Sequence, residues 1–167
     1  MILKTPWVRV WYDTNADYYH ASRGDVVMIA AMTTDNKIIM IHQYKEGPHH
    51  AVWQLPAGHI NAGEPYVDAA ARELHEEVGL RGEDWEEFGD WYIDTSWRRD
   101  KVRVYTCRVS LPAKFVPSEA ISSVGGIPIG DAGWMVRRGQ VLDPHSCIAI
   151  LLLETELLYK WRTNEDI

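Results

Sequence analysis

Residues 58–80 read GHINAGEPYVDAAARELHEEVGL, and this stretch decides the fold. From Pro65 onward its apolar residues recur at helical spacing and share one face: Val67, Ala70, Ala71, Leu74 and Val78. Proline suits the first turn of a helix, because its missing N–H would have no partner there, and Gly79 is a typical residue at a helix end. The stretch therefore predicts a helix over Pro65–Val78 with one face turned to a core.

Three acidic residues share the opposite face of this helix. Glu73 and Glu77 are four residues apart and lie one turn above each other, and Glu76 adjoins them. Like charges at this spacing repel, so such a face is either solvated or holds a cation. Oxygen ligands alone suit a hard divalent ion such as Mg²⁺ or Mn²⁺. The spacing by itself leaves a solvated acidic face and a metal site as the two interpretations.

The complete spacing of the stretch resembles the signature of the Nudix hydrolases. The matching positions are Gly58, Glu64, Arg72, Glu73, Leu74, Glu76, Glu77, Gly79 and Leu80. Residues 53–58, WQLPAG, are similar to the approach to this motif in the ADP-ribose pyrophosphatase branch of the family. The resemblance implies an α/β (α+β) fold. The implied fold is an α/β/α sandwich with a mixed central sheet, in which the motif forms a catalytic loop–helix–loop.

The resemblance also implies a metal site. Glu73, Glu76 and Glu77 are expected to ligate Mg²⁺, or Mn²⁺ in its place, with the backbone carbonyl of Ala57 as a further ligand. Arg72 is expected to orient these carboxylates during catalysis. The expected cofactor is therefore a divalent metal ion held between a helix and the loop before it.

The supporting residues and the general base follow from the same resemblance. Gly58 and Glu64 are expected to brace the motif from behind the ligands. A hydrolysis also needs a group that takes a proton from the attacking water. Glu119, in a loop after the last predicted strand, is the candidate, with Glu76 or a solvent-relayed group as the alternatives.

The charge balance favours a small anionic substrate bound through metal. The chain has 17 Lys and Arg against 24 Asp and Glu, a formal net charge of −7, which disfavours long nucleic acid and anionic membranes. The resemblance implies hydrolysis of a nucleoside diphosphate linked to another group, of the ADP-ribose or sugar-nucleotide type, to release a nucleoside monophosphate. A nucleoside triphosphate or capped-RNA pyrophosphohydrolase and a non-catalytic nucleotide sensor are the alternatives.

The polar loop Asp94–Lys101 holds the candidates for substrate binding. Trp97 is expected to stack on a base or sugar, and Arg98 or Arg99 to pair with a phosphate, unless the loop is simply solvated. Gln54 stands where the ADP-ribose branch commonly has an acid, so one polar contact to the substrate is expected to differ there.

The length of 167 residues predicts a single domain over residues 1–167. Beyond the motif, strands are expected over residues 26–32, 37–44, 52–55, 85–93 and 102–109, with helices over 131–138 and from Ser146 to about Trp161. Residues 26–32 and 37–44 are expected to form a buried hairpin, and residues 112–126 to be irregular.

Residues 1–22 predict an N-terminal strand pair, and the resemblance implies that it serves a homodimer. Trp7 and Trp11 on an exposed edge would need to be covered. Cys107 and Cys147 lie far apart, which favours free thiols, and no apolar run is long enough for a signal peptide or a membrane span. We therefore expect a cytoplasmic protein without membrane contact.

Overall fold

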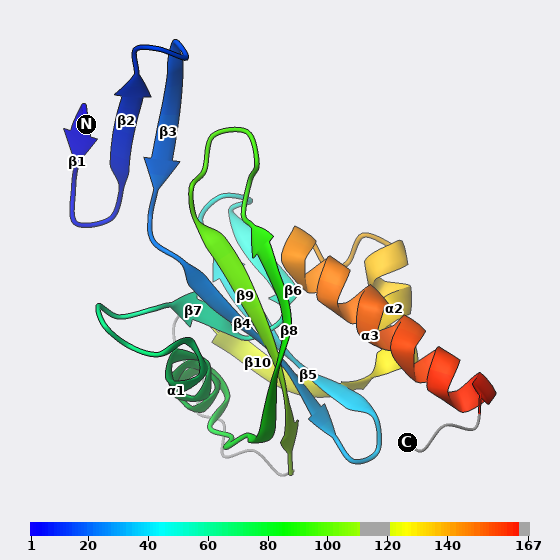
Figure 1. The fold of residues 1–167 in the computed structure, drawn as a ribbon. Helices are drawn as coiled ribbons and strands as arrows, with labels where there is room; N and C mark the ends of the chain where they lie inside the picture. Colours follow the sequence, from blue (N-terminus) through cyan, green and yellow to red (C-terminus); the bar gives the residue numbers. More distant parts are fainter. Residues whose placement is uncertain (111–120, 164–167) are drawn as a thin grey trace.

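The computed structural model describes residues 1–110 and 121–163, arranged as two sheets and three helices (Figure 1). The N-terminal sheet contains three antiparallel strands, β1 (Leu3–Lys4), β2 (Arg9–Asp13) and β3 (Tyr18–Ser22). The sequence predicted only a strand pair here; β1 is added by its pairing with β2. In Figure 1 this sheet stands away from the main body, to which β3 leads directly.

The central sheet has seven strands: β4 (Val26–Thr33), β5 (Lys37–Lys45), β6 (His50–Gln54), β7 (Ala57–His59), β8 (Glu83–Tyr92), β9 (Lys101–Val109) and β10 (Ile121–Pro128). Its main order is β10-β5-β4-β9-β8, while β6 pairs with β5 and β7 pairs with β4. Only β4 and β9 run parallel, and the other pairs are antiparallel, so the sheet is mixed as predicted.

The predicted hairpin of β4 and β5 forms its turn but then opens. Asn36 takes a left-handed φ of 58° in the turn, and the register pairs Met32 with Ile38. Further along, β7 replaces β5 beside β4, with Met28 opposite Ala57. This exchange brings the backbone of Ala57 and its neighbours into the middle of the sheet, next to the helix that follows.

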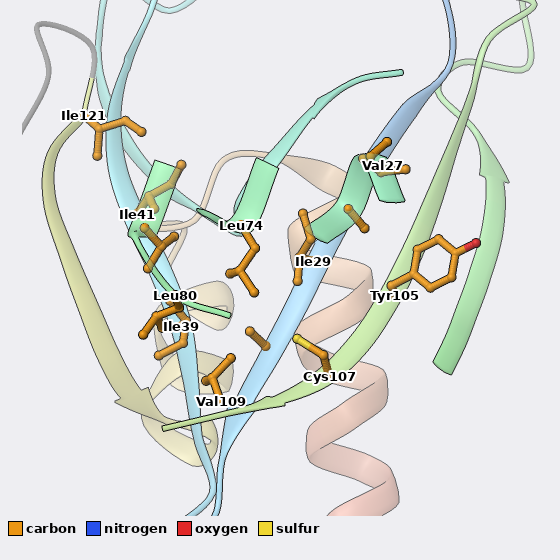
Figure 2. Close-up of a cluster of buried hydrophobic side chains, with 14 residues drawn as sticks. Val27, Ile29, Ile39, Ile41, Leu74, Leu80, Tyr105, Cys107, Val109 and Ile121 are labelled. Carbon is orange, nitrogen blue, oxygen red and sulfur yellow. The ribbon is translucent and has the colours of Figure 1, made fainter. Parts of the chain in front are cut away.

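The helices cover both faces of the sheet (Figure 1). Helix α1 (Tyr66–Val78) lies on one face, and α2 (Ile129–Arg137) and α3 (Pro144–Thr163) lie on the other. Figure 2 shows Leu74 of α1 directed into a buried cluster of aliphatic side chains from the sheet. The predicted α/β/α sandwich is therefore confirmed. None of the helices in the described ranges is long and apolar enough to cross a membrane.

Two predictions for the C-terminal part of the chain were wrong. Residues 121–128 form β10 rather than an irregular segment, because they pair with β5 over nearly its whole length. Helix α3 begins at Pro144 rather than Ser146, since Asp143 Oδ2 accepts the Ser146 N–H at 2.7 Å. The Ser146 hydroxyl is fully buried and accepts the Leu55 N–H at 3.0 Å instead of capping the helix.

Candidate active site

Helix α1 presents its three acids to the loop that precedes it. Leu74 and Val78 are fully buried on the inner face, which turns Glu73, Glu76 and Glu77 the other way. The helix ends at Gly79, whose φ of 74° needs glycine and whose N–H donates to His75 O at 2.9 Å. The predicted end of the helix is confirmed.

Gly58 lets the backbone of β7 approach the carboxylate of Glu73. A Cβ atom at position 58 would lie 2.0 Å from the Glu73 carboxyl carbon, far inside van der Waals contact. Any residue other than glycine would therefore push the carboxylate away. The structure therefore brings the backbone of Gly58 and the carboxylate of Glu73 together.

Glu77 faces the same backbone segment one turn later. Its Oε2 accepts a hydrogen bond from the Ala57 N–H at 2.9 Å. Ala57 therefore contacts this acid through its N–H and not through its carbonyl. Burial raises the pKa of Glu77 to about 7; the bond from Ala57 opposes the shift, and the charges of Glu73 and Glu76 add to it. Glu77 therefore holds a proton more readily than an exposed glutamate does.

Arg72 binds the remaining acids through all three of its nitrogens. Its Nη1 donates to Glu73 Oε1 at 2.7 Å and to Glu76 Oε2 at 3.1 Å. Its Nε and Nη2 donate to the two oxygens of Glu64 at 2.9 and 3.0 Å, and Nη2 also donates to His59 O at 3.0 Å. A planar guanidinium with five donors suits such a multiple contact. Arg72 therefore fixes where these acids lie.

Glu64 joins this network at the end of the loop before α1. The pKa of Glu64 is lowered to about 2. The hydrogen bonds from Arg72 are the largest cause, and the bond from the Asn61 N–H at 2.9 Å is the next. A carboxylate that stays ionised under nearly all conditions keeps Arg72 in place.

The oxygen donors of this region fit a hard divalent cation, although the three carboxylates do not point at one common position. Across residues 1–110 and 121–163, no three His, Cys, Asp or Glu side chains lie close enough together to hold a metal. Glu73 and Glu76 contact Arg72, while Glu77 contacts Ala57. The donors available are oxygens with excess negative charge, placed against a glycine backbone.

Lys45 is a residue that sequence reasoning missed. It ends β5 and is half-buried, and burial lowers its pKa, opposed by the charges of Glu77 and Asp143. The structure therefore places a cation near Glu77, the acid of the motif whose pKa is raised. The signal in the sequence was a lone lysine after an apolar strand, which was too weak to interpret.

The predicted substrate residues of the 94–100 loop lie at the junction of the two sheets. Backbone bonds tie the loop to the end of β3: Ala21 N–H donates to Trp97 O at 2.8 Å, and Arg99 N–H donates to Ala21 O at 3.1 Å. Trp97 is 48% exposed, and the Arg99 guanidinium lies 5.7 Å from the ring centroid of Trp11. Trp97 and Arg99 therefore remain available to a ligand.

Arg98 and Gln54 are engaged elsewhere. The guanidinium of Arg98 pairs with Asp100, which is 2% exposed, so its fork is not free for a phosphate. Gln54 is 4% exposed and donates to Gln43 Oε1 at 3.0 Å. Both side chains thus have polar partners within the protein, Asp100 and Gln43, that spacing does not reveal. Glu119 lies outside the described residues.

His59 lies between the junction and the motif. Burial lowers its pKa, as do the charges of Arg23 and Arg98, whereas Asp100 and Glu73 oppose the shift. These neighbours come from both the 94–100 region and α1. His59 is also bonded to α1, because its backbone carbonyl accepts from Arg72 Nη2 at 3.0 Å.

Comparison with known proteins matches the NUDIX domain to residues 22–137. The chain is 35% identical over 130 residues to an ADP-ribose pyrophosphatase of Mycobacterium tuberculosis, covering 75% of this chain and 62% of that protein. It is 38% identical over 133 residues to a methanol dehydrogenase activator of Bacillus methanolicus, covering 78% and 72%. An ADP-ribose pyrophosphatase of Bacillus subtilis is 25% identical over 131 residues, covering 77% and 71%. The chain thus spans less than two thirds of the Mycobacterium protein.

Proposed function

This chain belongs to the Nudix hydrolase family, and we propose that it hydrolyses the pyrophosphate bond of a nucleoside diphosphate linked to a sugar or similar group. The product would be a nucleoside monophosphate. The observation that carries the proposal is the placement of Glu73 and Glu77 against the backbone of Ala57 and Gly58. The ADP-ribose pyrophosphatases among the similar proteins support this substrate class.

The metal would be Mg²⁺, with Mn²⁺ as the alternative, held by Glu73, Glu76, Glu77 and the carbonyl of Ala57. When bound, it neutralises the pyrophosphate oxygens and lowers the pKa of a water molecule. The raised pKa of Glu77 supports this assignment, since an uncompensated carboxylate favours a cation beside it.

Arg72 orients the carboxylates without being a ligand. Its bonds to Glu64 and His59 O do not involve the proposed ligands, so they would hold the guanidinium in place when Glu73 and Glu76 bind a cation. Gly58 leaves room for the Glu73 carboxylate, which a Cβ at this position would meet at 2.0 Å. For the general base we propose Glu119, with Glu76 as the alternative.

Lys45, Trp97 and Arg99 would bind the substrate. The half-buried ammonium of Lys45 lies near Glu77 and would contact a phosphate oxygen there. The exposed ring of Trp97 and the guanidinium of Arg99 offer a stacking surface and a positive charge to the base or sugar. Arg98 would act by shaping the loop through Asp100.

We further propose a homodimer formed through the N-terminal sheet. Trp7 is 75% exposed, and Ile2 and Leu3, at and beside β1, are also exposed; exposed apolar side chains gathered in one place favour a covering partner. Light scattering at micromolar concentration should give twice the chain mass, and Trp7→Ser should shift it toward the monomer. A monomeric mass for the parent would contradict the dimer.

The hydrolysis is tested with ADP-ribose, sugar nucleotides and nucleoside triphosphates in the presence of Mg²⁺. Nucleoside monophosphate from the first two classes is expected. Glu77→Gln should lower kcat about a thousandfold or more, because several kcal/mol of metal-derived stabilisation would be lost. Glu156→Gln, an exposed acid on α3, is the matched control and should leave kcat unchanged. Pyrophosphate released only from triphosphates would indicate the other substrate class instead.

A further inference from the structure

We propose that Asp25 is a positioning residue that ties the metal-binding loop and the 94–100 loop to one point of the central sheet. Asp25 directly precedes β4 and is half-buried. The inference rests on the proposed function, because that function assigns what the two loops do.

Asp25 holds both ends of the loop between β7 and α1. Its backbone carbonyl accepts the Ile60 N–H at 3.4 Å, just after β7. Its Oδ2 accepts the hydroxyl of Tyr66, the first residue of α1, at 2.9 Å. Gly58 precedes this loop and Glu73 follows it, so the two bonds set the start of α1 relative to the strand that carries Gly58. We call this the metal side of Asp25.

The ring of Tyr66 is held on its face as well as at its hydroxyl. The guanidinium carbon of Arg103 on β9 lies 4.0 Å from the ring centroid. Arg103 Nη2 in turn donates to Asp90 Oδ2 at 3.4 Å. A cation over the ring and a bond at its tip restrain Tyr66 in two directions. The hydroxyl bond to Asp25 therefore acts on a side chain that is already oriented.

The other oxygen of Asp25 holds the end of the 94–100 loop. Its Oδ1 accepts the Lys101 N–H at 2.9 Å. Asp100 makes the reverse connection: its carboxylate accepts hydrogen bonds from the N–H groups of Arg23 and Gly24 at 2.9 and 3.2 Å. The two acids thus cross-link the start of β4 to the start of β9. We call this the loop side of Asp25.

The two oxygens have separate partners, so the two sides are separable by substitution. Tyr66→Phe removes only the side-chain bond on the metal side, the one between the Tyr66 hydroxyl and Asp25 Oδ2. Asp25→Ala removes both side-chain bonds. Asp25→Asn keeps both, because its Oδ1 still accepts from Lys101 and its amide can donate to the oxygen of Tyr66.

The experiment measures Mn²⁺ affinity without substrate, by electron paramagnetic resonance, and KM for the best nucleotide substrate at saturating Mg²⁺. Tyr66→Phe should weaken Mn²⁺ binding about fivefold and leave KM within about twofold, the size expected for one hydrogen bond. Asp25→Ala should weaken Mn²⁺ binding and raise KM, each about fivefold or more. Asp25→Asn should stay close to the parent in both.

Tyr12→Phe is the matched control, because Tyr12 also donates its hydroxyl to a carboxylate, that of Asp17, but in the N-terminal sheet. It should change the Mn²⁺ affinity by less than about twofold. Thermal unfolding of each variant confirms that it is folded. If Asp25→Ala does not fold, Tyr66→Phe still tests the metal side by itself.

Mn²⁺ binding by Tyr66→Phe equal to that of Tyr12→Phe would overturn the inference. So would an Asp25→Ala variant whose KM rises no more than that of Tyr66→Phe. Glu73→Gln and Glu77→Gln separate this failure from that of the proposed function. If both bind Mn²⁺ like the parent, the proposed metal site is wrong; if both lose it while Tyr66→Phe does not, only the role of Asp25 is wrong.

Discussion

Helices α1 and α3 pack on opposite faces of one sheet, and their outer faces differ in kind. Both bury aliphatic side chains completely, Leu74 in α1 and Ile150 in α3. The outer face of α1 carries acids bound to Arg72, whereas that of α3 exposes apolar side chains such as Ile148 and Leu152. The inner faces stabilise the fold, whereas the outer face of α1 gathers like charges, which disfavours the helix unless a cation compensates them.

Truncation of the inner faces should affect both helices equally. Leu74→Ala and Ile150→Ala each remove a fully buried side chain, so each should lower the free energy of unfolding by about 3 kcal/mol. Urea unfolding followed by circular dichroism measures this. At a temperature where both variants are folded, Leu74→Ala should lose more activity, since it loosens the helix that bears the acids. Equal losses of activity would argue against a special role for α1.

A methyl group at Gly58 should disturb the acidic face of α1 specifically. Gly58→Ala would displace the Glu73 carboxylate, and we expect kcat/KM to fall about a hundredfold, the effect of a misplacement near 1 Å. Gly130→Ala in α2 is the control, because a Cβ there meets nothing within 4 Å. That variant should keep its activity and gain about 0.5 kcal/mol of stability. Full activity of Gly58→Ala would show that the close approach does not matter.

The acid face of α1 should also make stability depend on pH. The folded-state pKa of Glu77 is raised to about 7, above its unfolded value, so the folded state retains a proton that the unfolded state has already lost. Without metal, this group therefore costs stability as pH rises from about 5 to 8, on the order of 2 kcal/mol. Melting temperatures across this range measure it. Glu77→Gln should flatten the dependence, and an unchanged slope would assign it to other groups.

The smallest effect concerns two lysines of β5. Lys45→Ala should raise KM about fivefold, because it removes a half-buried cation near Glu77. Lys37→Ala is the control: its ion pair with Asp35 is short, at 2.6 Å, but both side chains are exposed, so its loss should change neither KM nor stability by much. Steady-state kinetics at saturating Mg²⁺ compare the two. Equal KM values would remove Lys45 from the proposed substrate contacts.

Much of the α1 region could be predicted because its signals are local. Helical spacing, a proline at the start and Gly79 at the end depend on residues within a few positions of one another. Strand β10 could not be predicted, since Ser122, Ser123, Gly125 and Gly126 show no alternation and the strand exists through its pairing with β5. The pairing of Arg98 could not be predicted for a similar reason: its partner Asp100 is two residues away in sequence, but only the fold buries that carboxylate.

The amino-acid sequence by itself determined which acids share a helix face, where that helix ends and that a glycine precedes it. Tertiary structure decided what those groups meet: Gly58 against Glu73, Ala57 against Glu77, and Lys45 nearby. It also decided that Asp25 and Asp100 join segments more than seventy residues apart. The physical reason is that helix spacing follows from local backbone geometry, whereas the partners of a buried charge depend on which distant segments pack together.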